Sequence, residues 1–272
     1  MEAYMEKKNA EIQAINRQTF SQRLKSYKRS PLSLILLILV SMSALITVMT
    51  LLFLLAYILI KGVPYLTPDL FAWEYNSENV SLMPALINTI IMTGLSLIIA
   101  APLGIFSAFY LVEYAKRGNK LVALIRITAE TLSGIPSIVY GLFGFLLFAV
   151  TFQWSYTILG GALTLAIMIL PLIMRTAEEA LKSVPDSYRE ASFGLGAGKL
   201  RTIFKIVLPS AVPGILSGVI LATGRVVGET AALLFTAGTI AKVAGLMDSG
   251  RTLAVHMYAL SSEGLYMNQM YA

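Results

Sequence analysis

The sequence predicts an all-α membrane protein, a polytopic bundle of transmembrane helices. Of its 272 residues, 57% are apolar and only 13% are charged, and the mean hydropathy is +0.74. Soluble domains carry roughly a quarter charged residues. The apolar residues also gather in blocks long enough to cross a hydrocarbon core of about 30 Å. The chain has no cysteine, which excludes disulfides, thiolate metal sites and a thiol nucleophile.

Five spans are expected, with a basic tail before them and one long polar loop between the last two. The tail covers residues 1–31, and the loop covers residues 175–209. The expected spans lie at about 32–60, 84–112, 121–150, 158–174 and 210–238. We interpret the first as an uncleaved span, because a signal peptide has a much shorter apolar region.

The basic residues are concentrated on one side of this topology. Of 21 Lys and Arg residues, 17 fall in the tail, in the turn after the second span with Arg126, and in the long loop. Three lie on the other side, and Arg225 lies within a span. The positive-inside rule therefore predicts that the N-terminus and the long loop are cytoplasmic. The same distribution argues against a nucleic-acid partner, despite the net charge of +6.

The long loop has a pattern of its own. Val184-Pro185 should end the helix that continues from the fourth span. Ser187 and Glu190 then have capping-box spacing, so a new helix is predicted to begin near Ser187. Helical spacing places four residues of it on one face: Tyr188, Ala191, Ser192 and Leu195.

A second short helix is predicted at Lys199–Val207, and Leu208-Pro209 should return the chain to the membrane. Gly198-Lys199 looks like the end of a P-loop. However, Phe193 stands where the first glycine belongs, and Leu200 stands where the magnesium ligand belongs. We therefore expect no ATP binding by this chain.

Two i, i+4 charge pairs fall in the apolar blocks. Arg225 and Glu229 would face the same side of one helix, where such charges cost about 3 kcal/mol each unless they pair or face an aqueous path. Arg126 and Glu130 are interpreted as a snorkelling pair at the boundary. Gly134-x-Pro136 should kink the third span. His256, the only histidine, has no clustered ligands, so no metal site is expected.

Part of the long loop resembles the EAA signature of ABC importer permeases. Its elements are Glu190-Ala191-Ser192, then Gly196, then Ile206–Pro209, and it departs from the pattern only by Ser192 at the third position. The resemblance extends from Leu32 to about Gln269. Two further stretches, Gly134–Val139 and Gly224–Ala237, resemble the PstA-type phosphate permeases.

The resemblance implies an inner-membrane, non-catalytic permease subunit of the type I importer fold, which needs no cofactor. A dimer of ATP-binding subunits, a second homologous permease and a soluble phosphate-binding protein would be its partners, within a lipid bilayer. ATP would be hydrolysed by the partner, which would grip the short helix of the loop. The residues implied in that coupling are Tyr188, Glu190, Ala191, Ser192, Leu195 and Gly196. Arg225 and Glu229 would line the path of inorganic phosphate.

Three expectations stay open. One alternative is a permease for another oxyanion or small solute. A different class is a proton-coupled secondary transporter or channel that uses Arg225 and Glu229 as a relay. Phosphate permeases of this kind usually carry one more span, which would begin near Met270, so we expect a sixth span to be missing at the C-terminus.

Overall fold

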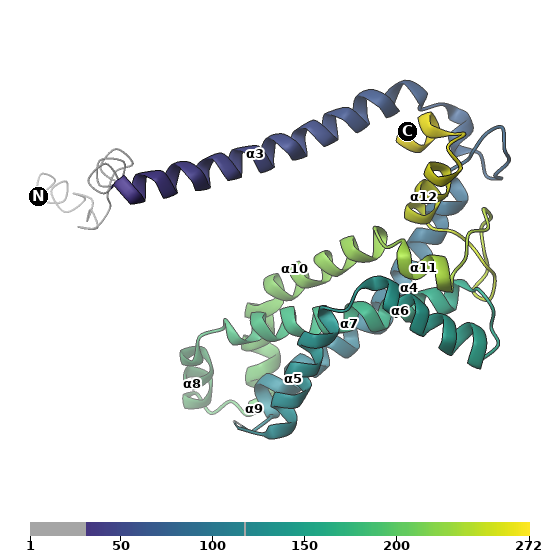
Figure 1. The fold of residues 1–272 in the computed structure, drawn as a ribbon. Coiled ribbons are helices and arrows are strands. Elements are labelled where there is room, and N and C mark those ends of the chain that lie inside the picture. The colour runs from purple at the N-terminus through teal and green to yellow at the C-terminus, as the bar shows by residue number, and fades with distance from the viewer. Residues whose placement is uncertain (1–30, 117) are drawn as a thin grey trace, which may run out of the picture. The chain divides into compact units, whose positions relative to one another are not determined.

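A computed structural model describes residues 31–116 and 118–272, and the predicted basic tail lies outside this range apart from its last residue. All regular elements in the described part of the chain are helical (Figure 1). Four helices are long and apolar enough to cross a membrane, and a bent helix pair is a fifth candidate. The predicted fold class, an all-α membrane bundle, is confirmed. The chain divides into two compact units at Lys61/Gly62, and each is described by itself.

The first unit contains one long apolar helix, α3 (Pro31–Gly62). Its 32 residues correspond to about 48 Å of helix, longer than a hydrocarbon core of about 30 Å. None of its most apolar stretch is buried. A helix that is apolar on all sides and has no protein cover is suited to lipid.

The second unit holds the remaining elements. In chain order they are η2 (Val63–Tyr65), η3 (Pro68–Phe71), α4 (Met83–Phe109), η4 (Tyr110–Tyr114), α5 (Lys120–Ser133), α6 (Ser137–Gly144), η5 (Phe145–Thr151), α7 (Ile158–Lys182), α8 (Asp186–Gly194), α9 (Lys199–Thr202), η6 (Ile203–Val207), α10 (Leu208–Val227), α11 (Ala231–Thr236), α12 (Leu253–Glu263) and α13 (Met267–Tyr271). Of these, η4, η5 and η6 are π-helical and η2 and η3 are 3₁₀ helices.

Helices α4 and α7 form the centre of this unit. Met92 of α4 and Leu165 and Ile169 of α7 are buried in one apolar cluster. The two backbones approach closely at Gly104, where an added Cβ would lie 3.0 Å from the Ile173 side chain. Helices α5, α6, α10 and α11 pack against α7, and α10 and α12 also contact α4.

The third apolar block is two helices rather than one kinked span. Helices α5 and α6 are bent by 100° across the break at Gly134–Pro136. Pro136 has φ −58° and ψ 140°, which ends the helical path, and α6 begins at the next residue. The kink predicted from Gly134-x-Pro136 is therefore much sharper than a bend within one helix.

The long polar stretch is largely helical. Helix α7 runs on through Lys182 and ends just before Val184-Pro185, as predicted, so the stretch begins inside a helix. The predicted separate helix Lys199–Val207 is wrong as an independent element, because α9, η6 and α10 form one helix, Lys199–Val227. Pro209 lacks an N–H and crowds the preceding turn. The π-helical turn η6 lies directly before it, where a wider turn accommodates the proline without ending the helix.

The fifth apolar block ends earlier than predicted. Helix α10 stops at Val227 instead of running to residue 238, and the short helix α11 follows. The segment after α11 is tied to α4 by Asn88, whose side chain is fully buried. Its amide nitrogen donates to the carbonyls of Lys242 (2.8 Å) and Arg251 (3.1 Å), and its oxygen accepts from the Ala244 N–H (3.1 Å). The segment is therefore a packed part of the bundle.

Candidate functional site

Helix α8 stands at one end of the second unit, away from α12 (Figure 1). It begins at Asp186, directly after Pro185, which occupies the N-cap position without a side-chain cap. The predicted capping box of Ser187 and Glu190 is therefore wrong. Pro185 has φ −57° and ψ 138°, an extended conformation from which the helix starts one residue earlier. Asp186 places a carboxylate in the first turn, where the helix dipole favours it.

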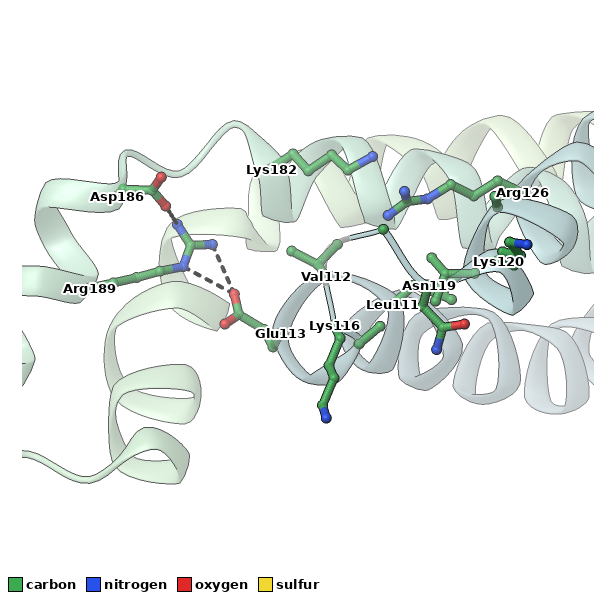
Figure 2. A pocket seen from close by; sticks show the side chains of 14 residues that line it. Leu111, Val112, Glu113, Lys116, Asn119, Lys120, Arg126, Lys182, Asp186 and Arg189 are labelled. Carbon is green, nitrogen blue, oxygen red and sulfur yellow. Dashed lines mark hydrogen bonds and ion pairs between the residues drawn. The ribbon is translucent and has the colours of Figure 1, made fainter.

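A single guanidinium, that of Arg189, fixes α8 to the rest of the bundle. Its Nε and Nη2 donate to Oε1 of Glu113 in η4, at 3.1 and 2.9 Å. Nη2 also donates to the Leu181 carbonyl (3.0 Å), and Nη1 donates to the Val184 carbonyl (2.8 Å). Nη1 further reaches Oδ1 of Asp186 at 3.2 Å (Figure 2). We call this set of contacts the Arg189 clamp.

The clamp is mostly removed from solvent. The side chains of Arg189 and Glu113 are 15% and 8% exposed. Arginine presents five donors in a rigid fork, so one side chain can join α8, the end of α7 and the turn after α4. Sequence analysis missed Arg189 as a key residue. Its partner Glu113 is 76 residues away, and no local spacing signals such a pair.

The residues of the predicted contact face of α8 differ in their exposure. Tyr188 is 52% and Leu195 is 90% exposed, and Ala191 and Glu190 are exposed too. Ser192 instead points inward. It is 3% exposed, and its hydroxyl lies 2.8 Å from the Thr202 hydroxyl, which is equally buried. Ser192 thus joins α8 to α9 at the buried side of this face.

Gly196 ends α8 in a conformation that favours glycine. Its φ is +81°, in the left-handed region, and its N–H donates to the Phe193 carbonyl at 2.9 Å. This is a common way for a helix to satisfy its last carbonyls. The glycine predicted for coupling therefore has a clear backbone role.

An open groove of about 560 Å3 lies beside α8. It is lined by five of the six residues predicted for coupling, namely Tyr188, Ala191, Ser192, Leu195 and Gly196. Arg201 and Lys205, from α9 and η6, form part of its wall. The structure therefore gathers most of the predicted coupling residues on one surface with basic side chains beside it.

The second predicted pair, Arg225 and Glu229, does not share a helix face. Arg225 lies in the last turn of α10, which ends at Val227, and Gly228 is its C-cap. Glu229 is buried, and its Oε1 accepts the N–H of Ala232 at 3.1 Å, at the start of α11. The i, i+4 prediction is wrong because the helix breaks between the two residues. In the part of the chain that the structure describes, Arg225 makes no ion pair.

The two breaks, between α5 and α6 and between α10 and α11, lie close together. Gly141 of α6 packs on α11 so tightly that an added Cβ would lie 2.7 Å from Cα of Ala232. Arg225 interacts electrostatically with the buried Tyr140 phenol, which donates to the Leu132 carbonyl at 2.8 Å. The stretches 134–139 and 224–237, more than 80 residues apart in the chain, thus border one region. Broken helices inside a membrane commonly line solute sites.

The predicted pair of Arg126 and Glu130 is also wrong. Nε of Arg126 lies 2.6 Å from Oε1 of Glu178 on α7, and Lys182 reaches the same oxygen at 2.6 Å. Glu130 lies 3.9 Å from Arg175. Neighbouring helices supply the partners, which spacing within one helix does not reveal.

At the opposite end of the unit, His256 is buried at 4% exposure. Burial, and then the nearby Arg251 charge, lower its pKa to about 4. Within residues 31–116 and 118–272, no three His, Asp or Glu side chains cluster as a metal site.

Comparison with known proteins identifies the class to which this architecture belongs. Residues 100–260 match the family described as "Binding-protein-dependent transport system inner membrane component". That range covers more than half of the chain and includes α8, its groove and Arg225. The chain belongs to this family, and it is a multi-pass permease component of a transport system.

Its relatives specify the type. The chain is 36% identical over 226 residues to the "Probable ABC transporter permease protein YqgI" of Bacillus subtilis, covering 77% of this chain and 76% of that protein. It is 34% identical over 219 residues to the phosphate transport system permease protein PstA of Haemophilus influenzae, covering 80% and 77%. With PstA 1 of Mycobacterium tuberculosis the identity is 43% over 154 residues, 57% of this chain and half of that protein. The resemblance to ABC permeases of the PstA type is confirmed.

Solved structures support the same fold. A chain of a bacterial ABC transporter for import of the acidic polysaccharide alginate superposes with a TM-score of 0.62, at 17% identity and over 92% of this chain and 91% of that one. A chain of the inward-facing MetNI methionine ABC transporter gives 0.53, at 20% identity and over 70% and 82%. These structures show that the fold is that of type I ABC importer permeases.

Proposed function

We propose that this chain is the permease subunit of an ATP-driven importer of inorganic phosphate, and that α8 receives the motion of a separate ATPase. The N-terminus and α8 would be cytoplasmic, as the distribution of Lys and Arg favours. Phosphate is the substrate named for the PstA relatives. The observation that carries the proposal is the joining of an exposed helix to the central helices through one arginine.

A transmitting element must present a surface to its partner and be firmly attached behind that surface. Helix α8 meets both conditions. Leu195 and Tyr188 are exposed beside the groove, whereas Arg189 on the same helix is clamped to Glu113 and to the end of α7. A displacement of α8 would therefore be transmitted to α4 and α7. Glu190 is exposed and free to pair with a basic residue of the ATPase.

Arg225 is the proposed contact for phosphate. Its planar, permanently charged guanidinium matches phosphate oxygens, and no described carboxylate neutralises it. Glu229 would act indirectly, because its carboxylate holds the start of α11 beside the path. One arginine does not neutralise a doubly charged phosphate, so a second homologous permease would supply further charge. A soluble phosphate-binding protein would deliver the substrate outside.

The substrate is tested by uptake of labelled phosphate into proteoliposomes that contain the assembled transporter, with sulfate as competitor. We expect ATP-dependent uptake that excess sulfate leaves largely intact. Efficient competition by sulfate would point to a general oxyanion permease. Uptake driven by a proton gradient with no ATPase present would contradict the proposal.

Coupling is tested by capture of the ATP-binding subunit with Leu195→Asp. Because Leu195 is 90% exposed, this change does not disturb the core, and we expect capture and uptake to be lost. The matched control is Leu246→Asp, at a residue 51% exposed in the segment after α11, which should retain both. Equal loss in the two variants would remove α8 from the interface.

A further inference from the structure

A polar cavity lies beside the start of α8 (Figure 2), and it shares no lining residue with the groove. Its volume is about 540 Å3, within the usual range of small-ligand sites, about 300–1,000 Å3. The turn after α4, the start of α5 and the end of α7 surround it. Its lining includes five basic residues but only two acidic ones. The basic residues are Lys116, Lys120, Arg126, Lys182 and Arg189.

Two of the basic residues share one buried carboxylate, that of Glu178. Glu178 is 4% exposed, and both Arg126 and Lys182 reach its Oε1 at 2.6 Å. Figure 2 shows the ends of these two basic side chains directed toward each other. Two cations thus share one anion, and a net positive charge remains. The side chains of Arg126 and Lys182 are 41% and 51% exposed, so a solute can reach them.

On the far wall, Glu113 and Asp186 share the single positive charge of Arg189. That wall therefore keeps one negative charge, and the positive excess of the cavity comes from two rim lysines. Lys116 and Lys120 stand exposed on the rim, and neither makes an ion pair with any residue in the described ranges. Lys116 points away from Arg126 and Lys182 (Figure 2). It therefore contributes to the positive electrostatic potential of the cavity more than to direct contact with a bound ligand.

We propose that this cavity binds a phosphate group, held by Arg126 and Lys182 with Lys120 at the rim. Arg126 and Lys182 share the single negative charge of Glu178, and a bound phosphate would supply further negative charge beside them. Arg126 uses Nε toward Glu178, which leaves its two terminal nitrogens for phosphate oxygens. The group could belong to free inorganic phosphate or to the head group of an anionic lipid. The site is independent of the translocation proposal.

The test uses the full chain with Arg225→Gln, so that any binding in the translocation path is removed. In the first arm, inorganic phosphate is titrated into phosphatidylcholine nanodiscs and binding is followed by ³¹P line broadening. In the second arm, nanodiscs that contain phosphatidic acid are analysed by native mass spectrometry for retained lipid. A response in the first arm identifies the free ion, and a response in the second identifies the head group.

Paired variants decide whether binding occurs in this cavity. Lys182→Gln should weaken binding about tenfold, as expected for a lost charged hydrogen bond. Glu178→Gln frees both cations and should strengthen binding, which a purely structural role would not produce. Lys120→Gln, at an exposed residue, should weaken binding several-fold without affecting the fold. The charge-matched control Lys242→Gln, outside the cavity, should leave binding unchanged.

Two results would overturn the proposed phosphate site. No binding in either arm overturns the proposal. Binding that is equal in Lys182→Gln, Glu178→Gln and the control places the ligand elsewhere and also overturns it. Circular dichroism confirms folding of each variant, and Lys120→Gln keeps the test decisive if Glu178→Gln does not fold.

Discussion

Two arginines of the second unit are opposites in their surroundings. Arg189 makes hydrogen bonds to two carboxylates and to two backbone carbonyls, and its side chain is 15% exposed. Arg225 is half-buried near the ends of two broken helices, and no carboxylate among the described residues pairs with it. The acid four residues away, Glu229, is engaged with α11 instead.

The difference separates a structural role from a binding role. A guanidinium whose donors are all engaged fixes the elements it joins, and removing one partner leaves a buried charge uncompensated. A guanidinium without an acid in a low-dielectric region retains most of its attraction for an anion that arrives. We therefore expect substitutions of the Arg189 clamp to affect stability, and substitutions of Arg225 to affect transport.

The largest expected effect is on transport. Arg225→Gln should abolish phosphate uptake while the transporter still assembles, because no described ion pair depends on Arg225. Arg225→Lys keeps the charge but not the planar fork, so it should recover only part of the activity. Lys242→Gln, a charge change at an exposed ion pair with Asp248, is the control. The measurement is labelled-phosphate uptake alongside subunit stoichiometry, and normal uptake by Arg225→Gln would remove this residue from the mechanism.

Substitutions in the Arg189 clamp should instead lower the stability of the fold. Glu113→Ala leaves Arg189 buried without its main acid, and the expected loss of stability is about 3 to 5 kcal/mol. Asp186→Ala removes the other acid, whose side chain is 73% exposed, and should cost about 1 kcal/mol or less. Thermal unfolding in detergent measures both. Equal losses in the two variants would show that burial does not distinguish the two carboxylates.

Sequence reasoning predicted the helical membrane class, because that class depends on composition and local order. The end of α7 before Pro185 and the break at Gly134-x-Pro136 follow from the chemistry of proline itself. The charge pairs could not be predicted in the same way. Arg126 and Glu113 find partners on other helices, and sequence spacing within one helix carries no information on them.

The predicted end of the fifth span at residue 238 was wrong for a related reason. The run from residue 210 to 238 is apolar almost throughout, so hydropathy gives no sign that the helix stops at Val227. The close packing of Gly141 against Ala232 depends on α6 and α11 being separate short helices. That packing is a tertiary preference, and it separates Arg225 from Glu229.

A third arginine extends the comparison to the opposite end of the unit. Arg251 is 5% exposed, stacks 4.6 Å from the centre of the Tyr75 ring, and lies near His256. Burial and this cation lower the pKa of His256 to about 4, from an ordinary value of 6.5. The folded state therefore favours neutral imidazole. The contribution of His256 to the free energy of unfolding is therefore complete above pH 6.5 and declines as the pH falls toward 4.

We expect the stability advantage of wild type over His256→Gln to shrink by about 2 to 3 kcal/mol between pH 7 and pH 4.5. Unfolding of both proteins across this range provides the measurement, and comparing them cancels the carboxylates that titrate in both. A constant difference between wild type and variant would show that His256 titrates normally and that Arg251 does not affect it.

The smallest effect concerns the hydroxyl pair that joins α8 to α9. Ser192 stands where the EAA signature has its second alanine, so Ser192→Ala restores the common pattern and should cost about 1 kcal/mol or less. Thr202 would not be left without a partner, because its hydroxyl also donates to the Gly198 carbonyl at 3.3 Å. Thr202→Val is the more damaging change, since Ser192 would keep a buried hydroxyl with no other described partner, at a cost of about 1 to 3 kcal/mol. Thr202→Val should therefore lower the unfolding temperature more than Ser192→Ala does. Ser192→Ala should leave uptake nearly unchanged. The reverse order would mean that Ser192, and not Thr202, holds α9 in place, and that α8 depends on this contact as well as on Arg189.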